Sequence, residues 1–97
     1  MNNDWQKYLG LAQRAGAVLY GIDNINSARQ KIELIILDAE SATQNLVLKV
    51  ENFASKKNIN LIKLQKKLDE CLHSKNCKVV GITNKDLANQ IESKIKE

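Results

Sequence analysis

The sequence Lys-Ile-Glu-Leu-Ile-Ile-Leu-Asp-Ala-Glu-Ser-Ala-Thr-Gln-Asn, residues 31–45, decides the fold of this chain. An unbroken apolar run, residues 34–37, lies in it between Glu33 and Asp38. Such a run is typical of a strand that is covered on both faces, because a half-buried strand alternates apolar and polar residues. We therefore expect the central strand of a sheet here.

A helix is expected directly after this strand. Ser41 and Gln44 have the spacing of a capping box, in which the serine hydroxyl accepts from the Gln44 amide and the glutamine side chain reaches back. The apolar residues that follow have helical spacing, and they are Leu46, Val47, Val50, Phe53 and Ala54. A helix with such a stripe packs on a flat apolar surface, and the preceding strand is the simplest one available.

Length and composition limit the architecture. The chain has 97 residues, of which 43% are apolar, so we expect one domain over residues 1–97, because each half alone is too small to bury a core. No segment approaches the roughly 18 continuous apolar residues of a membrane span, and the N-terminus lacks the pattern of a secretory signal. We expect a cytoplasmic protein without membrane contact, and a monomer, because the periodicities are satisfied within one chain.

The residues that bind metals or act as nucleophiles are few. Cys71 and Cys77 are six residues apart, with only His73 near them, whereas thiolate metal sites usually need three or four ligands in closer pairs. We expect reduced structural cysteines, no metal and no cofactor. His73 has no second histidine and no nucleophile at a recognisable spacing, so we expect no catalysis.

Positive charge is concentrated in the second half of the chain. Residues 1–48 hold four Lys or Arg against five Asp or Glu, whereas residues 49–97 hold eleven against six. The densest part of this basic excess is Lys56, Lys57, Lys63, Lys66 and Lys67. Such a patch attracts phosphates without reading sequence, although a solvated lysine-rich surface is the alternative interpretation.

The other periodicities alternate between helical and extended. A first helix begins at Asn3 or Asp4 and ends at Gly16, and Gly10 inside it is unfavourable by ~1 kcal/mol relative to alanine, which predicts a close packing contact. Further strands are expected over residues 17–20, 59–64 and 78–83, and further helices over residues 22–28, 64–72 and 84–95. Asn58 is a suitable left-handed residue for the end of the helix before residues 59–64, and Thr83 or Asn84 can cap the last helix. This alternation predicts an α/β fold, a three-layer αβα sandwich in which a small mixed four-stranded sheet carries helices on both faces.

Four blocks of this sequence together resemble a known family. They are residues 9–16 (Leu-Gly-Leu-Ala-Gln-Arg-Ala-Gly), Tyr20-Gly21 before a short helix, residues 31–37, and residues 79–85 (Val-Val-Gly-Ile-Thr-Asn-Lys). The chain resembles, over nearly its whole length, the kink-turn-binding ribosomal protein superfamily, the ribosomal L-seven-Ae and L-thirty-e group. The resemblance is strongest to the small stand-alone ribosomal-like proteins of Gram-positive bacteria.

The resemblance implies an αβα sandwich that binds sharply bent RNA without catalysis or cofactor. In the family, a glycine followed by Thr-Asn-Glu begins the second helix and meets the sheared G·A pairs of the kink. A lysine one helical turn later contacts the RNA backbone, and an apolar loop after the third strand covers an extruded base of the RNA. RNA is generally recognised in this way, by its shape and its unstacked nucleotides.

Transferred to this chain, the resemblance predicts RNA contacts in two segments. The first runs from the end of the first helix into the second, and the second is the loop after the third strand. The predicted RNA-binding residues are Arg14, Gly21, Asp23, Asn24, Ser27, Leu64, Gln65 and Lys66.

Three of these residues differ from the family pattern. Asp23 stands where asparagine is typical, Asn24 where glutamate is, and Ser27 where the lysine is. An aspartate accepts hydrogen bonds but cannot donate them and repels phosphate, and serine removes a positive charge. The resemblance implies that the partner is structured, kink-turn-like RNA, either ribosomal RNA or a ribosome-associated ribonucleoprotein. The three differences support an alternative, a diverged protein-interaction module that kept the fold and lost kink-turn recognition.

Overall fold

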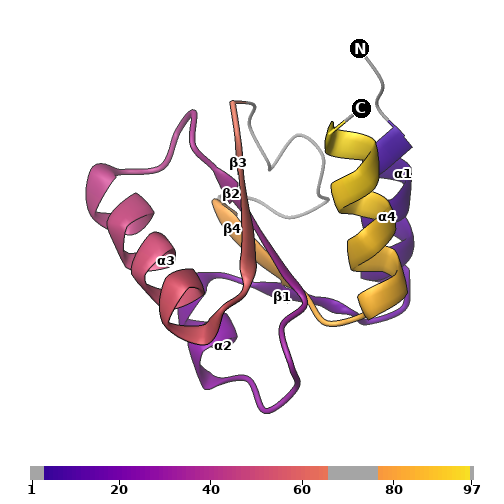
Figure 1. Cartoon of the computed structure of the whole chain (residues 1–97), viewed down its shortest axis with the longest axis horizontal. Coiled ribbons are helices and arrows are strands. Elements are labelled where there is room, and N and C mark those ends of the chain that lie inside the picture. The colour runs from indigo at the N-terminus through magenta and orange to yellow at the C-terminus, as the bar shows by residue number, and fades with distance from the viewer. Residues whose placement is uncertain (1–3, 66–76, 97) are drawn as a thin grey trace.

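Four helices and four strands make up the part of the chain that this computed structural model describes, residues 4–65 and 77–96 (Figure 1). In chain order the elements are α1 (Asp4–Arg14), β1 (Val18–Tyr20), α2 (Ile22–Ser27), β2 (Leu34–Asp38), α3 (Gln44–Lys57), β3 (Asn60–Leu64), β4 (Val79–Ile82) and α4 (Lys85–Lys96).

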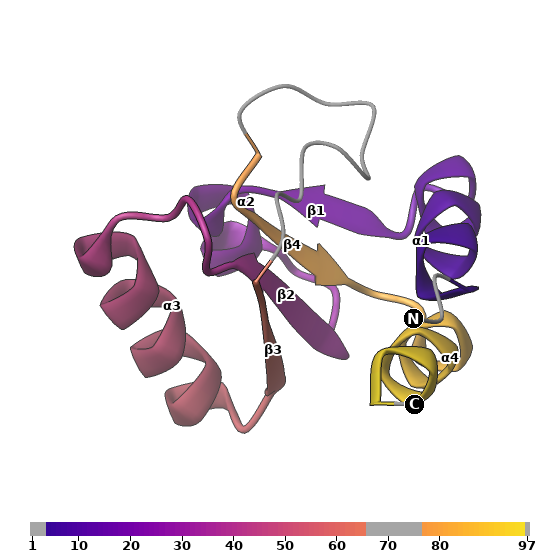
Figure 2. The ribbon, with the colours of Figure 1, turned by 90° about the horizontal axis from the view of Figure 1, so that it is seen from above.

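The four strands form one open mixed sheet in the order β1-β4-β2-β3. Strand β2 pairs parallel with β3, and β4 pairs antiparallel with both β1 and β2. Helices α1 and α4 cover one face, and α2 and α3 cover the other (Figure 2). The predicted α/β class, the three-layer αβα sandwich and the mixed four-stranded sheet are confirmed.

Strand β2 separates two hydrophobic cores. All five of its residues are buried, as the apolar run predicted, and it lies inside the sheet between β4 and β3. Leu34 and Ile36 pack with α1 and α4, whereas Ile35 and Leu37 pack with α2 and α3. Both faces of the strand are covered, which is why its sequence is continuously apolar.

Three expected helix ends are confirmed. Gly16 follows α1 with φ +70°, and Asn58 follows α3 in the left-handed conformation with φ 57°, where glycine and asparagine are favoured. At the start of α4, Asn84 Oδ1 accepts from the Leu87 amide at 3.0 Å, as expected of an N-cap.

The predicted capping box at Ser41 and Gln44 is wrong. Helix α3 begins at Gln44, and its N-cap is Thr43, whose Oγ1 accepts from the Leu46 amide at 3.2 Å. The Ser41 hydroxyl instead donates to Asp38 Oδ2 at 2.7 Å. Because Asp38 ends β2 three residues before Ser41, its side chain accepts the serine hydroxyl, and the serine closes the turn after β2.

The predicted close contact at Gly10 is also wrong. Among the described residues, a Cβ placed on Gly10 would meet no atom within 4 Å outside its own helix and its chain neighbours. The packing contact expected of a glycine occurs at Gly81 in β4, where a Cβ would lie 3.1 Å from Ile25 Cγ1. Close approach is therefore needed where a helix crosses the sheet, not along the half-buried side of α1.

Some expectations fall outside the described residues. These are the helix predicted over 64–72, apart from Leu64 and Gln65, as well as Cys71, His73, Lys66 and Lys67. Cys77 is buried in the core beneath α1 and α4, and its thiol donates to the Val79 carbonyl at 3.3 Å. Within the described ranges, none of the helices has the length and apolar character that a membrane crossing requires.

Candidate nucleic-acid interface

Several predicted RNA-binding residues lie at one end of the sheet. The Gly21 amide donates to the Val79 carbonyl at 2.9 Å, which places the end of β1 beside the start of β4. The Asp38 amide donates to the Lys78 carbonyl at 2.7 Å, and the Ala39 amide donates to the Leu64 carbonyl at 2.8 Å. One end of the sheet is therefore formed by the last residues of β1, β2 and β3 and the first residue of β4.

Gly21 and Leu64 are nevertheless not neighbours. Strands β1 and β3 are the two outer strands of the sheet, with β4 and β2 between them. Three inter-strand spacings of about 4.8 Å separate the two positions by roughly 14 Å. A ligand that touches both must extend across the end of the whole sheet.

The Gly21 turn has a conformation that other residues seldom adopt. Gly21 has φ 87° and ψ 149° and precedes the first residue of α2, and its carbonyl accepts from the Ile25 amide at 3.1 Å. This region of backbone conformation is essentially restricted to glycine. A glycine here lets β1 turn directly into a helix whose exposed side begins at Asp23.

The side chains of α2 use their donors inside the protein. Asn24 Nδ2 donates to the Tyr20 carbonyl at 2.6 Å, and Ser27 Oγ donates to the Asp23 carbonyl at 3.0 Å. Asp23, Asn24 and Ser27 are all exposed. The exposed face of α2 therefore presents acceptors, Asp23 Oδ1 and Oδ2 and Asn24 Oδ1, together with the side-chain amide of Asn26, and this mixture suits the edges of bases better than phosphates.

The other predicted residues are distributed differently. Arg14 is exposed at the end of α1, which leads into the start of β1, so it lies roughly 10 Å from Gly21 along the strand direction. Leu64 is half-buried against the core beneath α1 and α4, and Gln65 is exposed. The structure thus brings Gly21 and α2 to the same end as Leu64 and Gln65, but it leaves Arg14 at the opposite end.

A buried polar network, missed by the sequence analysis, lies between Gly21 and Leu64. Asp38 is fully buried, and its Oδ1 accepts from the Glu40 and Ser41 amides at 3.1 and 3.0 Å. Lys78 Nζ donates to Ser41 Oγ at 3.0 Å, and Ser41 in turn donates to Asp38. The network positions the side chain of Lys78, a half-buried residue, at the end of the sheet.

The sequence contained a partial signal for this network. Asp38 directly follows the apolar run, and a side-chain oxygen that accepts from amides two and three residues later is typical of an Asx turn. Lys78 is 37 residues away from Ser41, so no local pattern could connect them.

The predicted lysine patch divides into separate parts. Lys63 Nζ forms an ion pair with Glu51 Oε2 at 2.6 Å between two partly exposed side chains, whereas Lys56 and Lys57 are exposed in the last turn of α3. Among the described residues, no group of three or more His, Cys, Asp or Glu side chains could hold a metal ion.

Comparisons with known proteins add a match of fold. No family model and no curated protein matches this sequence. Among solved structures, a protein of unknown function from Bacillus halodurans is similar with a TM-score of 0.82 at 21% sequence identity, over 96% of this chain and 97% of that one. The similarity covers both chains almost entirely and shows the same α/β fold.

Proposed function

We propose that this chain binds structured, kink-turn-like RNA in the cytoplasm without catalysing a reaction, and that the RNA is ribosomal or part of a ribosome-associated ribonucleoprotein. The observation that carries the proposal is that the Gly21 turn with the start of α2 and the Leu64–Gln65 segment lie at the same end of the sheet, on its two outer strands. These are the segments that the resemblance assigns to RNA.

The geometry is suited to a bent RNA. RNA is recognised through its shape and its unstacked nucleotides, and a sharply bent RNA can present a paired stem and an extruded base to surfaces roughly 14 Å apart. Lys78 lies between these surfaces with its ammonium group positioned by Ser41. A positioned lysine is well placed to contact the phosphate backbone, which fixes orientation without reading sequence.

A titration tests the proposal. The purified protein is titrated against a short kink-turn RNA and against the same RNA with its G·A pairs replaced by Watson–Crick pairs, at two salt concentrations. We expect tight binding to the kink-turn alone. Equal and strongly salt-dependent binding to both RNAs would point instead to general phosphate binding by the lysines.

Two variants test the site. Asn24→Ala and Lys78→Gln should each weaken kink-turn binding, whereas Lys85→Gln is a matched control, because Lys85 follows the far end of β4 and is exposed at the opposite end of the sheet. If Lys78 contacts a phosphate, Lys78→Gln should also reduce the slope of the logarithm of affinity against the logarithm of salt concentration by about one. Unchanged affinity in both site variants would show that RNA is bound elsewhere.

The alternative function, a protein-interaction module, has its own supporting observation. The side chains of Asn24 and Ser27 donate to backbone carbonyls of this chain. Leu48 on α3 is 51% exposed, which is more than any other large apolar side chain in the described part. Affinity capture from a cell extract with and without nuclease separates the two functions. Partners retained after nuclease treatment would favour the protein module, and exclusive recovery of nuclease-sensitive RNA would oppose it.

A further inference from the structure

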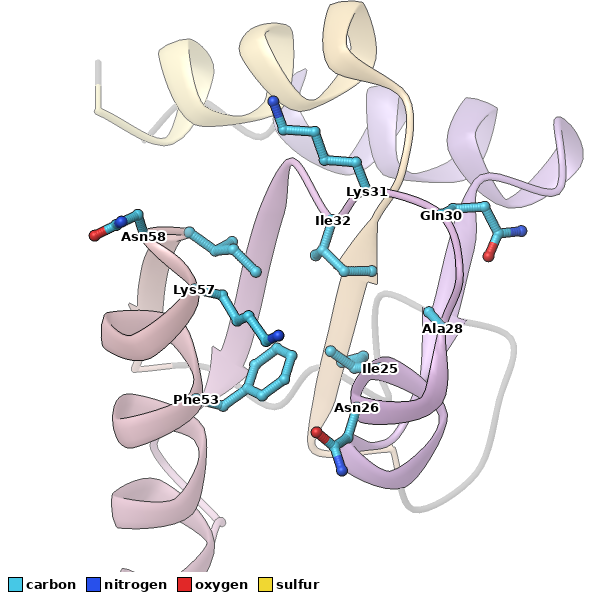
Figure 3. Close-up of a pocket in the computed structure, with 10 residues that line it drawn as sticks. Ile25, Asn26, Ala28, Gln30, Lys31, Ile32, Phe53, Lys57 and Asn58 are labelled. Carbon is cyan, nitrogen blue, oxygen red and sulfur yellow. The ribbon is translucent and has the colours of Figure 1, made fainter.

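A cavity of about 230 Å³ opens on the helical layer formed by α2 and α3 (Figure 3). It lies between the end of α2, the segment before β2 and the end of α3. None of the predicted RNA-binding residues that the structure describes lines it. The lining residues are Ile25, Asn26, Ala28, Gln30, Lys31, Ile32, Phe53, Lys57, Asn58 and Ile59.

The floor of the cavity is apolar and firmly packed. Ile25 and Ile32 are 1% and 7% exposed and belong to the core beneath α2 and α3, against which Phe53 and Ile59 also pack. Gly81 allows this arrangement, because a Cβ there would lie 3.1 Å from Ile25 and 3.3 Å from Ile32. A planar apolar group entering the cavity would therefore meet an ordered surface of one aromatic and three aliphatic side chains.

The rim of the cavity is cationic. Lys31 and Lys57 line it, no carboxylate does, and neither lysine forms an ion pair with a residue in the described ranges. In Figure 3 the Lys57 chain runs from α3 toward the cavity and its amine ends beside the Phe53 ring, whereas the Lys31 amine points outward. A bound anion would thus find one ammonium group at the cavity and a second on a flexible chain at the mouth.

We infer that this cavity binds a single nucleotide, with the base on Phe53 and the isoleucines and the phosphate at Lys57 and Lys31. The volume is below the roughly 300–1,000 Å³ of sites for drug-sized ligands, so it suits one base and not two. Stacking on Phe53 accepts any base, because every base has a π-face. Lys31 and Lys57 are both exposed, and their positive charge attracts an anionic ligand in preference to a neutral one.

The nucleotide can come from two sources, a free mononucleotide or an unpaired nucleotide of a bound RNA. Helix α2 connects the cavity to the candidate interface: Asn24 and Ser27 are on its exposed side, and Ile25 and Asn26 line the cavity. Its six residues span about 9 Å, which is short enough for one RNA strand to contact both. The RNA source rests on the proposed function, whereas the free mononucleotide does not.

The first experiment is an NMR titration of the intact protein with AMP, GMP, CMP and UMP, compared with the parent nucleosides and with inorganic phosphate. We expect shifts confined to the cavity residues and affinities for the monophosphates at least tenfold above those for nucleosides or phosphate. Lys57→Gln should lower the affinity for the monophosphates about five- to tenfold, and Phe53→Leu should lower it by at least fivefold. Lys56→Gln, which changes the neighbouring exposed lysine outside the lining, should leave the affinity unchanged.

The second experiment identifies the source. Binding is measured to a blunt kink-turn RNA and to the same RNA with an unpaired single-stranded extension. If RNA supplies the nucleotide, the extension should raise the affinity and Lys57→Gln should abolish that gain while leaving binding of the blunt RNA intact. If only the monophosphates respond to Lys57→Gln, the ligand is a free nucleotide.

Two results would overturn the inference. One is that Lys57→Gln changes neither monophosphate binding nor the gain from the extension. The other is that Lys56→Gln and Lys57→Gln have equal effects, which would indicate general charge attraction. Failure of the proposed function would be a separate result. It would appear as absent binding of the blunt kink-turn RNA, independently of the affinity for the monophosphates.

Discussion

The backbone requires glycine at residue 21 but not at residue 10. At both positions a Cβ would meet no atom of the described part of the chain within 4 Å beyond its immediate neighbours, so steric contact explains neither glycine. The backbone differs: Gly21 has φ 87° and ψ 149°, whereas Gly10 lies inside the regular helix α1. Conformation is therefore the reason for glycine at residue 21, and no comparable reason applies at residue 10.

Replacement of Gly21 tests this conformational argument. We expect Gly21→Ala to lower the free energy of unfolding by about 1–3 kcal/mol, because alanine is strained in this region of φ and ψ. Urea unfolding followed by circular dichroism measures the change. An unaltered unfolding midpoint would mean that the turn can rearrange without cost.

Replacement of Gly10 should have the opposite sign. We expect Gly10→Ala to raise the free energy of unfolding by about 0.5–1 kcal/mol, since alanine favours the helix and has open space here. The same urea experiment measures it, with the wild type as reference. A loss of stability would show that the side of α1 at Gly10 needs closer packing than these contacts indicate.

The hydrogen bonds of the Asp38 side chain lead to a second prediction about stability. Its removal in Asp38→Ala leaves the Glu40 and Ser41 amides and the Ser41 hydroxyl without their acceptor, which should cost about 2–3 kcal/mol. A double-mutant cycle with Ser41→Ala measures the part that belongs to the pair. Additive effects of the two substitutions would show that the 2.7 Å hydrogen bond contributes no coupling.

The junction between β2 and α3 shows how neighbouring elements compete for one polar side chain. Both Ser41 and Thr43 have the chemistry of an N-cap, and the spacing to Gln44 favoured Ser41. The buried carboxylate at the end of β2 binds Ser41, so the helix begins two residues later with Thr43. The boundary of α3 is thus decided by the strand that precedes it.

A substitution at Thr43 checks this helix boundary. We expect Thr43→Ala to lower the free energy of unfolding by about 1 kcal/mol, because the Leu46 amide loses its acceptor, and we expect Thr43→Ser to be close to neutral. Thermal and urea unfolding of both variants provide the comparison. Equal stability of the two variants would contradict the assignment of Thr43 as the cap.

The two cores of the molecule share the buried strand β2. Trp5, the single tryptophan of the chain, lies in the core beneath α1 and α4, and Val50 lies in the core beneath α2 and α3. Ile35 and Ile36 are adjacent in β2 and belong to different cores, so neither core can lose its order without exposing the strand that supports the other.

This arrangement predicts one cooperative unfolding transition. The fluorescence of Trp5 and the far-ultraviolet circular dichroism should give the same midpoint and the same dependence on urea concentration. A Val50→Ala variant, altered in the opposite core, should shift both signals equally. Separate midpoints would show that the two layers of helices unfold independently and would oppose a single domain over residues 1–97.

Local patterns in the chain were enough to predict most elements and their buried faces. The run over residues 34–37 predicted a fully covered strand, the stripe from Leu46 to Ala54 predicted the buried side of α3, and Asn58 predicted the end of that helix. These features depend on periodicity, capping and backbone preference over a few neighbouring residues, so a single sequence contains them. The resemblance to a family placed the candidate site at Gly21 and Leu64 but could not relate the two.

The way in which distant segments meet follows from packing over the whole chain. The order β1-β4-β2-β3 puts Gly21 and Leu64 at one end of the sheet but on opposite outer strands, and it brings Lys78 to Ser41 across 37 residues. The cavity at Phe53 likewise requires α2 and α3 to pack side by side on one face. Pairing and packing between distant segments are chosen by the burial of the whole chain, which no local pattern records.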